Sequence, residues 1–338
     1  MGHPIVICCD GTKNTFGRPD TNVRRVFDAL NDTPCHRYYD PGLGTDSKER
    51  WLDRISKPLS NIGASALALG QTRKVFEAYS FLSRHYVRGT KVYLFGFSRG
   101  AWCVRRLAKM VAVVGLPPPG CEHLIPQAYD AYERFKNNES KDGSVDEFCE
   151  SFQALGHQRM VESIFIGVWD TVRSAGLKLK SKDCELFENG KTAIVGRHAL
   201  ALDEKRRAFE PELWDDDPRV KQMWFPGDHS DVGGGHDVRS DRDLSYLSLA
   251  WICDEANQSG LKFDIEPILE KALNVRSRLS LDGETVNDKS NLIPFSINRR
   301  PIMSGNSKRR ISDEREIEID PAVRSRVEKL RSKKEAKR

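Results

Sequence analysis

The chain has 338 residues, of which 38% are hydrophobic and 30% charged. This composition is that of a globular protein with one large domain or two ordinary ones. No apolar run approaches the roughly eighteen residues of a membrane helix, and residues 1–10 lead into a strand pattern instead of a signal peptide. We therefore expect synthesis in the cytoplasm, with delivery by a specialised secretion system left open.

The cysteines and the distribution of charge exclude several classes of site. The eight cysteines form no C-x-x-C pair, so we expect reduced, buried thiols and neither a zinc site nor a disulfide framework. The net charge of +5 is concentrated in residues 301–338, which hold 12 Lys and Arg against 7 Asp and Glu. The basic end, 324–338, is predicted to be a solvated tail, with peripheral membrane contact as an alternative. No aromatic residue interleaves with these charges, which argues against a nucleic-acid partner.

Short apolar segments and helical patterns alternate along the chain. In chain order, the strands are predicted at 5–9, 92–97, 163–169 and 222–225, and the helices at 22–31, 64–85 and 101–114. This alternation predicts an α/β fold with a mostly parallel sheet and helices on both faces. Chemistry in such folds gathers at the carboxyl ends of the strands.

The segments between these elements are candidates for a cap over the site. Helical patterns at 127–135 and 145–155 follow the helix-ending residues 115–120, which contain three prolines. The polar stretch 173–191 is a second covering segment. We therefore expect a catalytic domain at 1–300, with helical cap elements within 116–160 and 173–191. Residues 301–338 would form a peripheral segment, and the pattern already weakens after Trp251.

The third strand pattern runs directly into the sequence Gly-Phe-Ser-Arg-Gly at residues 96–100, which is followed by a helical pattern. G-x-S-x-G between a strand and a helix is the nucleophile elbow of an α/β-hydrolase. Gly96 and Gly100 suit this turn because a side chain on either would meet neighbouring backbone. Ser98 is therefore predicted to be a catalytic nucleophile, and a solvated turn serine is the alternative.

A serine nucleophile needs a base and an orienting carboxylate, which α/β-hydrolases supply in the order Ser, Asp or Glu, His. Asp170 ends the strand pattern at 163–169, and His229 follows the strand pattern at 222–225. We predict Asp170 and His229 as the acid and the base. The alternatives are a helix N-cap or a turn carboxylate for Asp170 and a structural loop histidine for His229.

The loop around His229 offers further candidates. His236 is a rival base beyond three glycines, and Asp231 is expected to shape the loop through bonds to backbone N–H groups. Asp231 and His236, together with Asp228, His229 and Asp237, could hold a metal, but their spacing matches no ligand signature, so we expect no metal and no cofactor. Gly-Gly-Gly at 233–235 lacks the Lys-Ser/Thr of a phosphate loop, which argues against nucleotide binding.

The oxyanion formed during acyl transfer needs two backbone N–H donors. One is expected from Arg99, directly after the nucleophile, and the other from the loop after the first strand, at Gly11 or Thr12. Asp10 is expected to tie this turn together, and a direct catalytic role is the alternative.

Seven motifs together resemble a bacterial and fungal hydrolase domain of unknown function that includes the catalytic domain of class-one type VI secretion phospholipase effectors. They span roughly residues 5 to 250 in order. The matching segments are Cys-Asp-Gly-Thr-Lys-Asn at 9–14, Thr-Asn-Val at 21–23, Tyr-Asp-Pro-Gly-Leu-Gly-Thr at 39–45, Phe-Gly-Phe-Ser-Arg-Gly-Ala at 95–101, Gly-Val-Trp-Asp-Thr-Val at 167–172, His-Ala-Leu-Ala-Leu-Asp-Glu at 198–204 and Trp-Phe-Pro-Gly-Asp-His-Ser-Asp-Val-Gly-Gly-Gly at 224–235.

The resemblance implies an α/β-hydrolase fold, a triad at Ser98, Asp170 and His229, and esterase or phospholipase activity. Two features depart from the family: residues 63–70 are poorer in glycine, and the sequence ends at Arg338 without a long membrane-engaging extension. We therefore predict hydrolysis of carboxylic esters through an acyl-enzyme, with an ester or lipid as substrate and phospholipid left open. A catalytically silent interaction module and a metal-dependent phosphodiesterase are the alternatives. The oligomeric state is not predicted.

Overall fold

The computed structural model describes residues 2–11, 20–42, 66–136, 160–172, 192–206, 209–236 and 243–282. The predicted loop at 173–191, the predicted helix at 145–155 and the basic tail lie outside these residues. Within the described ranges, every helix is too short or too polar to cross a bilayer.

Six strands form one parallel sheet in the order β2-β1-β3-β4-β5-β6. β1, β3 and β4 are near-continuous apolar runs because helices cover both faces of the sheet. The pairing register brings the ends of β3, β4 and β5 level, with Phe97 beside Trp169 and Trp169 beside Ala199. The strands are β1 (Ile5–Cys9), β2 (His36–Asp40), β3 (Val92–Phe97), β4 (Ser163–Trp169), β5 (Ala193–Ala201) and β6 (Val220–Phe225).

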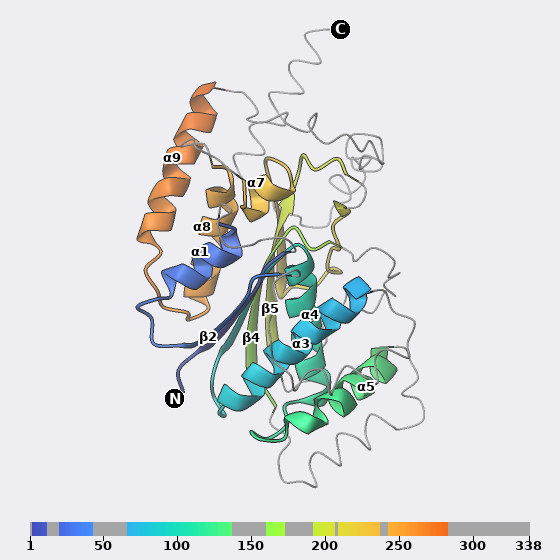
Figure 1. Ribbon diagram of the computed structural model, residues 1–338. Helices are drawn as coiled ribbons and strands as arrows, with labels where there is room; N and C mark the ends of the chain where they lie inside the picture. The colour runs from blue at the N-terminus through green and yellow to red at the C-terminus, as the bar shows by residue number, and fades with distance from the viewer. Residues whose placement is uncertain are drawn as a thin grey trace.

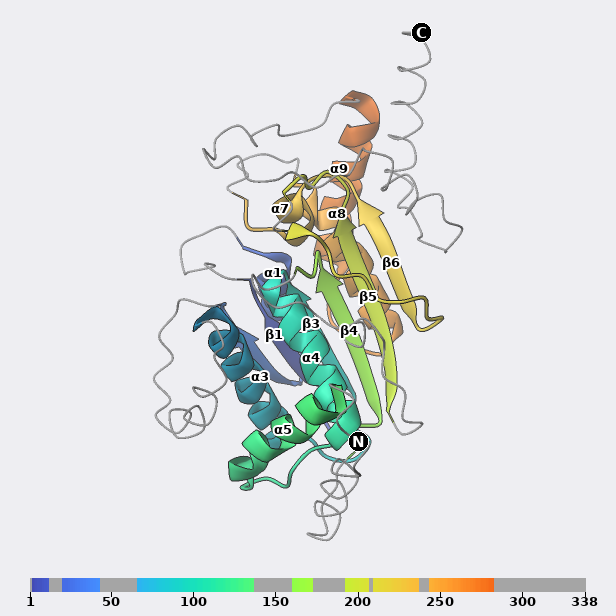
Figure 2. The same cartoon turned by 90° about the vertical axis from the view of Figure 1, so that its right-hand side faces the viewer.

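Helices cover both faces of the sheet (Figures 1 and 2). One face is covered by α3 (Ala66–His85), α4 (Arg99–Val114) and α5 (Ile125–Lys136), the last preceded by the 3₁₀ turn η2 (Glu122–Leu124). The other carries α1 (Asn22–Ala29), α8 (Ser245–Gln258) and α9 (Glu266–Asp282). A five-residue helix, α7 (His229–Gly233), lies at the carboxyl edge of the sheet.

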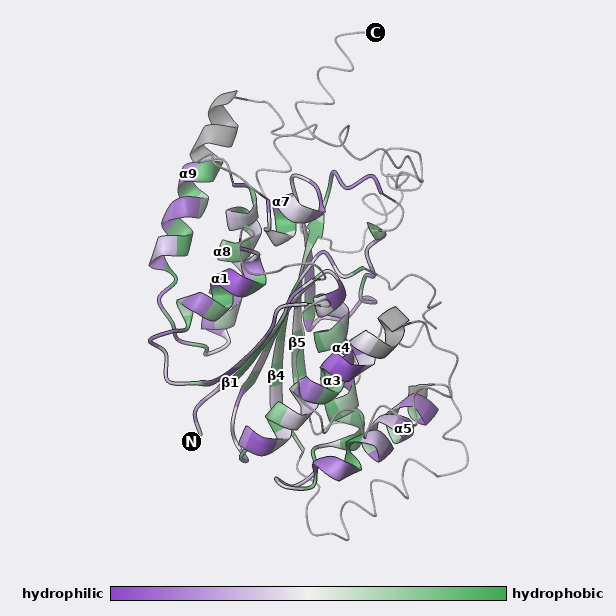
Figure 3. Ribbon diagram, in the orientation of Figure 1, coloured by the Kyte–Doolittle hydropathy of each residue, from purple (hydrophilic) through white to green (hydrophobic). Residues whose placement is uncertain are grey.

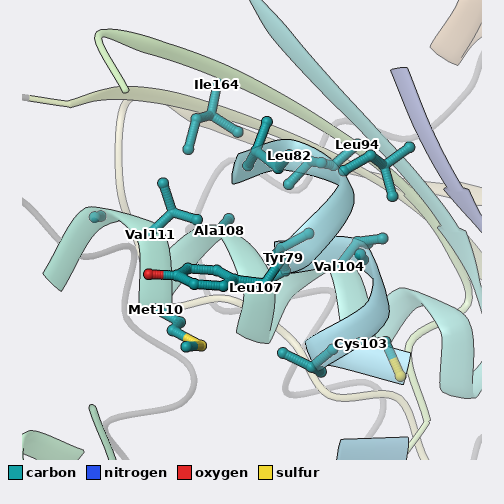
Figure 4. Close-up of a cluster of buried hydrophobic side chains, with 14 of the residues drawn as sticks. Tyr79, Leu82, Leu94, Cys103, Val104, Leu107, Ala108, Met110, Val111 and Ile164 are labelled. Atoms are coloured by element: carbon teal, nitrogen blue, oxygen red, sulfur yellow. The ribbon is translucent and has the colours of Figure 1, made fainter. Parts of the chain in front are cut away.

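Each face of the sheet has its own apolar core. Figure 4 shows the core under α3 and α4, where Tyr79, Leu107 and Val111 meet side chains of the sheet such as Leu94 and Ile164. Figure 3 shows hydrophobic residues along the strands and alternating hydrophobic and hydrophilic turns along α9. The two cores hold the carboxyl edge of the sheet in place, and the candidate site residues lie on that edge.

The predicted α/β class is confirmed, and several predicted elements need correction. β2 and β5 were absent from the prediction, and β6 begins at Val220 instead of residue 222. The helix predicted at 22–31 ends at Ala29, and the one predicted at 101–114 begins at Arg99. The pattern after Trp251 is helical, because α8 continues to Gln258 and α9 follows.

Candidate active site

Ser98 sits in the tight turn between β3 and α4. Its φ of 57° is one of two positive values among the non-glycine residues described, a conformation that costs energy and clusters at functional sites. The Ser98 N–H donates to the Trp169 carbonyl at 3.0 Å, so the turn is tied to the end of β4. Only 6% of Ser98 is exposed.

The two glycines of the motif permit close backbone contacts. A Cβ on Gly96 would lie 2.6 Å from the Ala101 Cα, and a Cβ on Gly100 would overlap the Cys9 carbonyl oxygen. Gly100 therefore lets the first turn of α4 touch the end of β1. The predicted reason for these glycines agrees with the packing.

Asp170 follows β4 and is completely buried. Its φ is 26°, the second positive value among the described non-glycine residues. Its N–H donates to the Ala199 carbonyl at 2.8 Å, and its Oδ1 accepts the Ala201 N–H at 3.0 Å. The carboxylate is thus clamped to the end of β5, with Oδ2 directed at the imidazole of His229.

His229 is the first residue of α7, whose N-cap is Asp228. Its Nδ1 lies 2.6 Å from Asp170 Oδ2. Since an ionised carboxylate only accepts, Nδ1 carries the proton and Nε2 is left as the basic nitrogen. The ring packs between Phe97 and Phe209, with centroid distances of 4.5 and 4.6 Å.

The structure brings Ser98, Asp170 and His229 to one edge of the sheet but does not link all three by hydrogen bonds. Phe97, which contacts His229, is the residue before Ser98. Among the described residues, the Ser98 hydroxyl makes no hydrogen bond to His229 or to any other group. Catalytic hydrogen bonds of free enzymes are often long and tighten when substrate binds.

The predicted oxyanion donors differ in their surroundings. Arg99 begins α4, where backbone N–H groups have no carbonyl partner within the helix. The Gly11 N–H donates to Asp10 Oδ1 at 2.8 Å. Thr12 lies outside the described residues. Arg99 is therefore the donor whose position the structure describes best.

Asp10 is 2% exposed and accepts hydrogen bonds from neighbouring groups. The Thr21 hydroxyl donates to its Oδ2 at 2.5 Å and the Tyr39 hydroxyl donates to the same oxygen at 2.8 Å. These bonds join the loop after β1 to α1 and β2. Its contacts are those of a residue that ties the turn together.

Asp228, Asp231 and His236 form a second cluster beside His229. Their ligand atoms all lie within 4.8 Å of one another. His236 Nε2 lies 3.2 Å from Asp228 Oδ1 and 3.5 Å from Asp231 Oδ1, which raises the pKa of His236. Asp231 Oδ2 accepts the Asp228 N–H, while Asp228 Oδ1 accepts the N–H groups of Ser230 and Asp231. The structure thus pairs the rival base His236 with Asp228, and not with Asp170.

Two buried residues that the motif analysis did not single out support the site. Glu204, 2% exposed, accepts the His229 N–H at 3.3 Å and pairs with Arg206. His198, fully buried in β5, accepts the Thr171 N–H at 3.1 Å. Both lie in the 198–204 motif that carries part of the family resemblance. That motif is the sequence signal that could have identified them.

Comparison with known proteins finds a family model that covers most of the chain. The family model described as "T6SS, Phospholipase effector Tle1-like, catalytic domain" matches residues 3–255. This match includes Ser98, Asp170 and His229, and it confirms the resemblance predicted from the motifs. An uncharacterized protein of Saccharomyces cerevisiae is 30% identical over 237 residues, which make up 66% of this chain and 34% of that relative.

Two solved structures are similar at low identity. An uncharacterized protein from Pseudomonas aeruginosa aligns with a TM-score of 0.45 and 17% identity, over 84% of this chain and 51% of that one. The Tle1 effector bound to the VgrG spike of the type 6 secretion system aligns with a TM-score of 0.35 and 18% identity, over 70% of this chain and 52% of that one. The chain therefore spans about a third of its curated relative and about half of each solved structure.

Proposed function

Because this chain belongs to the type VI secretion phospholipase effector Tle1-like catalytic domain family, we propose that it is a serine hydrolase that cleaves carboxylic esters of lipids. The reaction passes through an acyl-enzyme. His229 Nε2 takes the proton of Ser98 as the hydroxyl attacks the ester carbonyl, and Asp170 holds the imidazole in the required tautomer. His229 then returns the proton to the leaving alcohol, which breaks the ester bond.

Deacylation uses the same groups in reverse. His229 takes a proton from the water that attacks the acyl-enzyme carbonyl. It returns this proton to Ser98 Oγ as the bond to the acyl group breaks, which releases the carboxylic acid and restores the Ser98 hydroxyl. The backbone N–H of Arg99, with that of Gly11 or Thr12, stabilises the oxyanion in both steps. A hydrogen bond from Gly11 to the oxyanion requires that its N–H leave Asp10 Oδ1.

The observation that carries this proposal is the 2.6 Å bond between His229 Nδ1 and Asp170 Oδ2, beside a serine on a strained elbow. This bond leaves Nε2 as the nitrogen able to accept a proton. Asp170 is completely buried, which strengthens the electrostatic effect of its charge on the imidazole.

The decisive experiment compares Ser98→Ala with Ser259→Ala on a panel of phospholipids and soluble esters. We expect Ser98→Ala to lose about 10⁴-fold or more of kcat and all labelling by a fluorophosphonate probe, with an unchanged unfolding temperature. Ser259, at the end of α8, uses only its backbone groups in the hydrogen bonds described, so its variant should match the wild type. Wild-type turnover by Ser98→Ala would refute the proposal.

The same experiment separates the two alternatives. A catalytically silent module would show neither turnover nor fluorophosphonate labelling in the wild-type protein. A metal-dependent phosphodiesterase acting through Asp228, Asp231 and His236 would lose activity with a chelator and keep it in Ser98→Ala. We expect chelation to leave activity unchanged.

The wider organisation is part of the proposal. We assign residues 1–300 to the catalytic domain, with cap elements within 116–160 and 173–191 that select the acyl chain or head group. The described helix of this region, α5, packs on α4 and α3. Delivery by a type VI secretion system is proposed from the family, and membrane contact through the basic residues 324–338 is the alternative to a solvated tail. Deleting 324–338 should weaken binding to anionic vesicles and leave soluble-ester turnover unchanged.

A further inference from the structure

A buried hydrogen-bond network begins at Thr171, the residue that follows Asp170. Thr171 is fully buried and has both backbone groups fixed. Its N–H donates to His198 Nε2 at 3.1 Å, and its carbonyl accepts the Glu212 N–H at 2.7 Å. The peptide that follows the strained Asp170 backbone is therefore held from two sides.

His198 is oriented for this contact by its neighbours in the sheet. It lies on β5, paired with Val168 of β4 on one side and Gln222 of β6 on the other. Its Nδ1 lies 3.4 Å from Gln222 Oε1, and its ring meets Trp214 edge-on, with centroids 5.6 Å apart. An amide oxygen can only accept, so Nδ1 carries the proton and Nε2 accepts the Thr171 N–H.

Gln222 is itself fixed in place. Its side-chain amide makes two bonds to the backbone of Trp214, at 2.9 and 3.0 Å. The Arg105 guanidinium stacks over the Trp214 ring at 4.3 Å and donates to the Glu212 carbonyl at 2.5 Å. The network thus connects α4, the segment before β6 and the loop of Asp170.

Protonation would destroy the contact, because a charged imidazole has no acceptor nitrogen. Burial, reinforced by the Arg105 charge, lowers the pKa of His198 to about 3. The imidazole therefore stays neutral over the range in which His229 must act as a base.

We propose that His198 is a positioning residue of the reaction: its Nε2 fixes the Thr171 peptide and, through it, the angle at which the Asp170 carboxylate meets His229. This inference rests on the proposed function. Displacement of a catalytic group by about 1 Å can cost about 10²-fold in rate. Loss of the Nε2 acceptor should therefore lower kcat and leave substrate binding intact.

The test compares His198→Met with His198→Gln, two side chains of nearly equal length. Met removes the acceptor, whereas the Gln amide oxygen replaces Nε2. We expect His198→Met to lower kcat about 10- to 100-fold at unchanged KM and to shift the pH profile of kcat. His198→Gln should recover kcat to within a few-fold of the wild type.

A purely structural role gives a different result. His198→Met would then lower the unfolding temperature but keep the wild-type kcat and pH profile. Here kcat is expressed per folded molecule, with folded molecules counted by fluorophosphonate titration. This outcome would overturn the inference. If His198→Met does not fold, Gln222→Met leaves His198 present and removes its Nδ1 partner. We expect that variant to lose kcat several-fold with a shifted pH profile, and a wild-type kcat and profile would also overturn the inference.

Failure of the proposed function is recognised separately. In that case the wild-type protein shows no turnover and no labelling at Ser98, whatever residue stands at 198. Failure of the inference instead leaves an active wild-type enzyme that depends on Ser98 but not on the Nε2 acceptor of His198.

Discussion

The Ser98 turn is held through backbone contacts, whereas the side chains of Asp170 and His229 are themselves fixed by buried hydrogen bonds. The Ser98 turn is fixed by glycines that touch the end of β1 and the start of α4, and by a hydrogen bond from the Ser98 N–H to the Trp169 carbonyl. His229 depends on Asp170, Glu204 and two aromatic rings. Steric changes should therefore damage the elbow, while changes of charge or hydrogen bonding should damage the acid–base pair.

Asp170→Asn should have the largest effect. Ala201 N–H needs an acceptor at Oδ1, so the Asn amide nitrogen would occupy the Oδ2 position and donate to His229 Nδ1. His229 would then carry its proton on Nε2 and could not act as a base. We expect kcat to fall about 10⁴-fold, measured on a soluble ester.

The fold should survive this change, because Asn keeps the volume and the bond to Ala201. Asp254→Asn is the control, since Asp254 lies on α8 and bonds Gln258 of the same helix. A kcat within tenfold of the wild type in Asp170→Asn would show that the carboxylate does not set the tautomer of His229.

Gly100→Ala should act on stability through sterics alone. The added Cβ would overlap the Cys9 carbonyl oxygen, and the backbone of neither residue can move without disturbing β1 or α4. We expect a loss of about 3 kcal/mol or more of unfolding free energy, measured by urea denaturation.

Gly120→Ala separates this effect from backbone conformation. Gly120 has a φ of 85° and no atom within 4 Å of its would-be Cβ, so the cost there is conformational, about 1 kcal/mol. If Gly100→Ala and Gly120→Ala lost the same unfolding free energy, close backbone contact would not be the reason that the elbow requires glycine.

The same contrast explains what could be predicted from the sequence. The elbow was recognisable because its strand, turn and helix are contiguous and the glycines are local requirements. β2 escaped prediction because His36-Arg37-Tyr38-Tyr39-Asp40 is polar, as an edge strand can be. β5 was obscured by the polar residues Arg197 and His198, whose hydrogen-bond partners lie far along the chain.

The surroundings of His229 were harder to predict from the sequence than the strands. Asp228 and Asp231 form a capping box around α7, a signal that a five-residue helix makes easy to miss. The bonds of Glu204 and His198 join residues 25 and 27 positions apart, and no local pattern encodes them. The residue types and their order along the chain were enough to predict Asp170 and His229 as the acid and the base. Their contact, however, depends on the pairing register of the sheet.

An effect smaller than those of Asp170→Asn and Gly100→Ala should come from the carboxylate of Asp231, which lies in α7 close to the acid–base pair. Burial, followed by the nearby Asp228 charge, raises the pKa of Asp231 to about 6. The folded state therefore binds this proton more tightly than the unfolded chain, whose carboxyl titrates near 3.8. Stability due to this group is present below pH 4 and is lost as the pH rises to about 6.

Asp231→Asn keeps an oxygen to accept the Asp228 N–H and removes the titration. Relative to the wild type, we expect the variant to gain up to about 2 kcal/mol between pH 4 and 7, measured by urea denaturation at each pH. Asp217→Asn is the control of opposite sign, because bonding to Arg219 lowers the pKa of Asp217. The stability due to Asp217 is present above pH 4 and lost only as the pH falls further. If the stability of both variants relative to the wild type changed with pH in the same way, burial would not be the cause of the different pKa of Asp231. The acid–base half of the site would then be no more sensitive to charge than an ordinary loop.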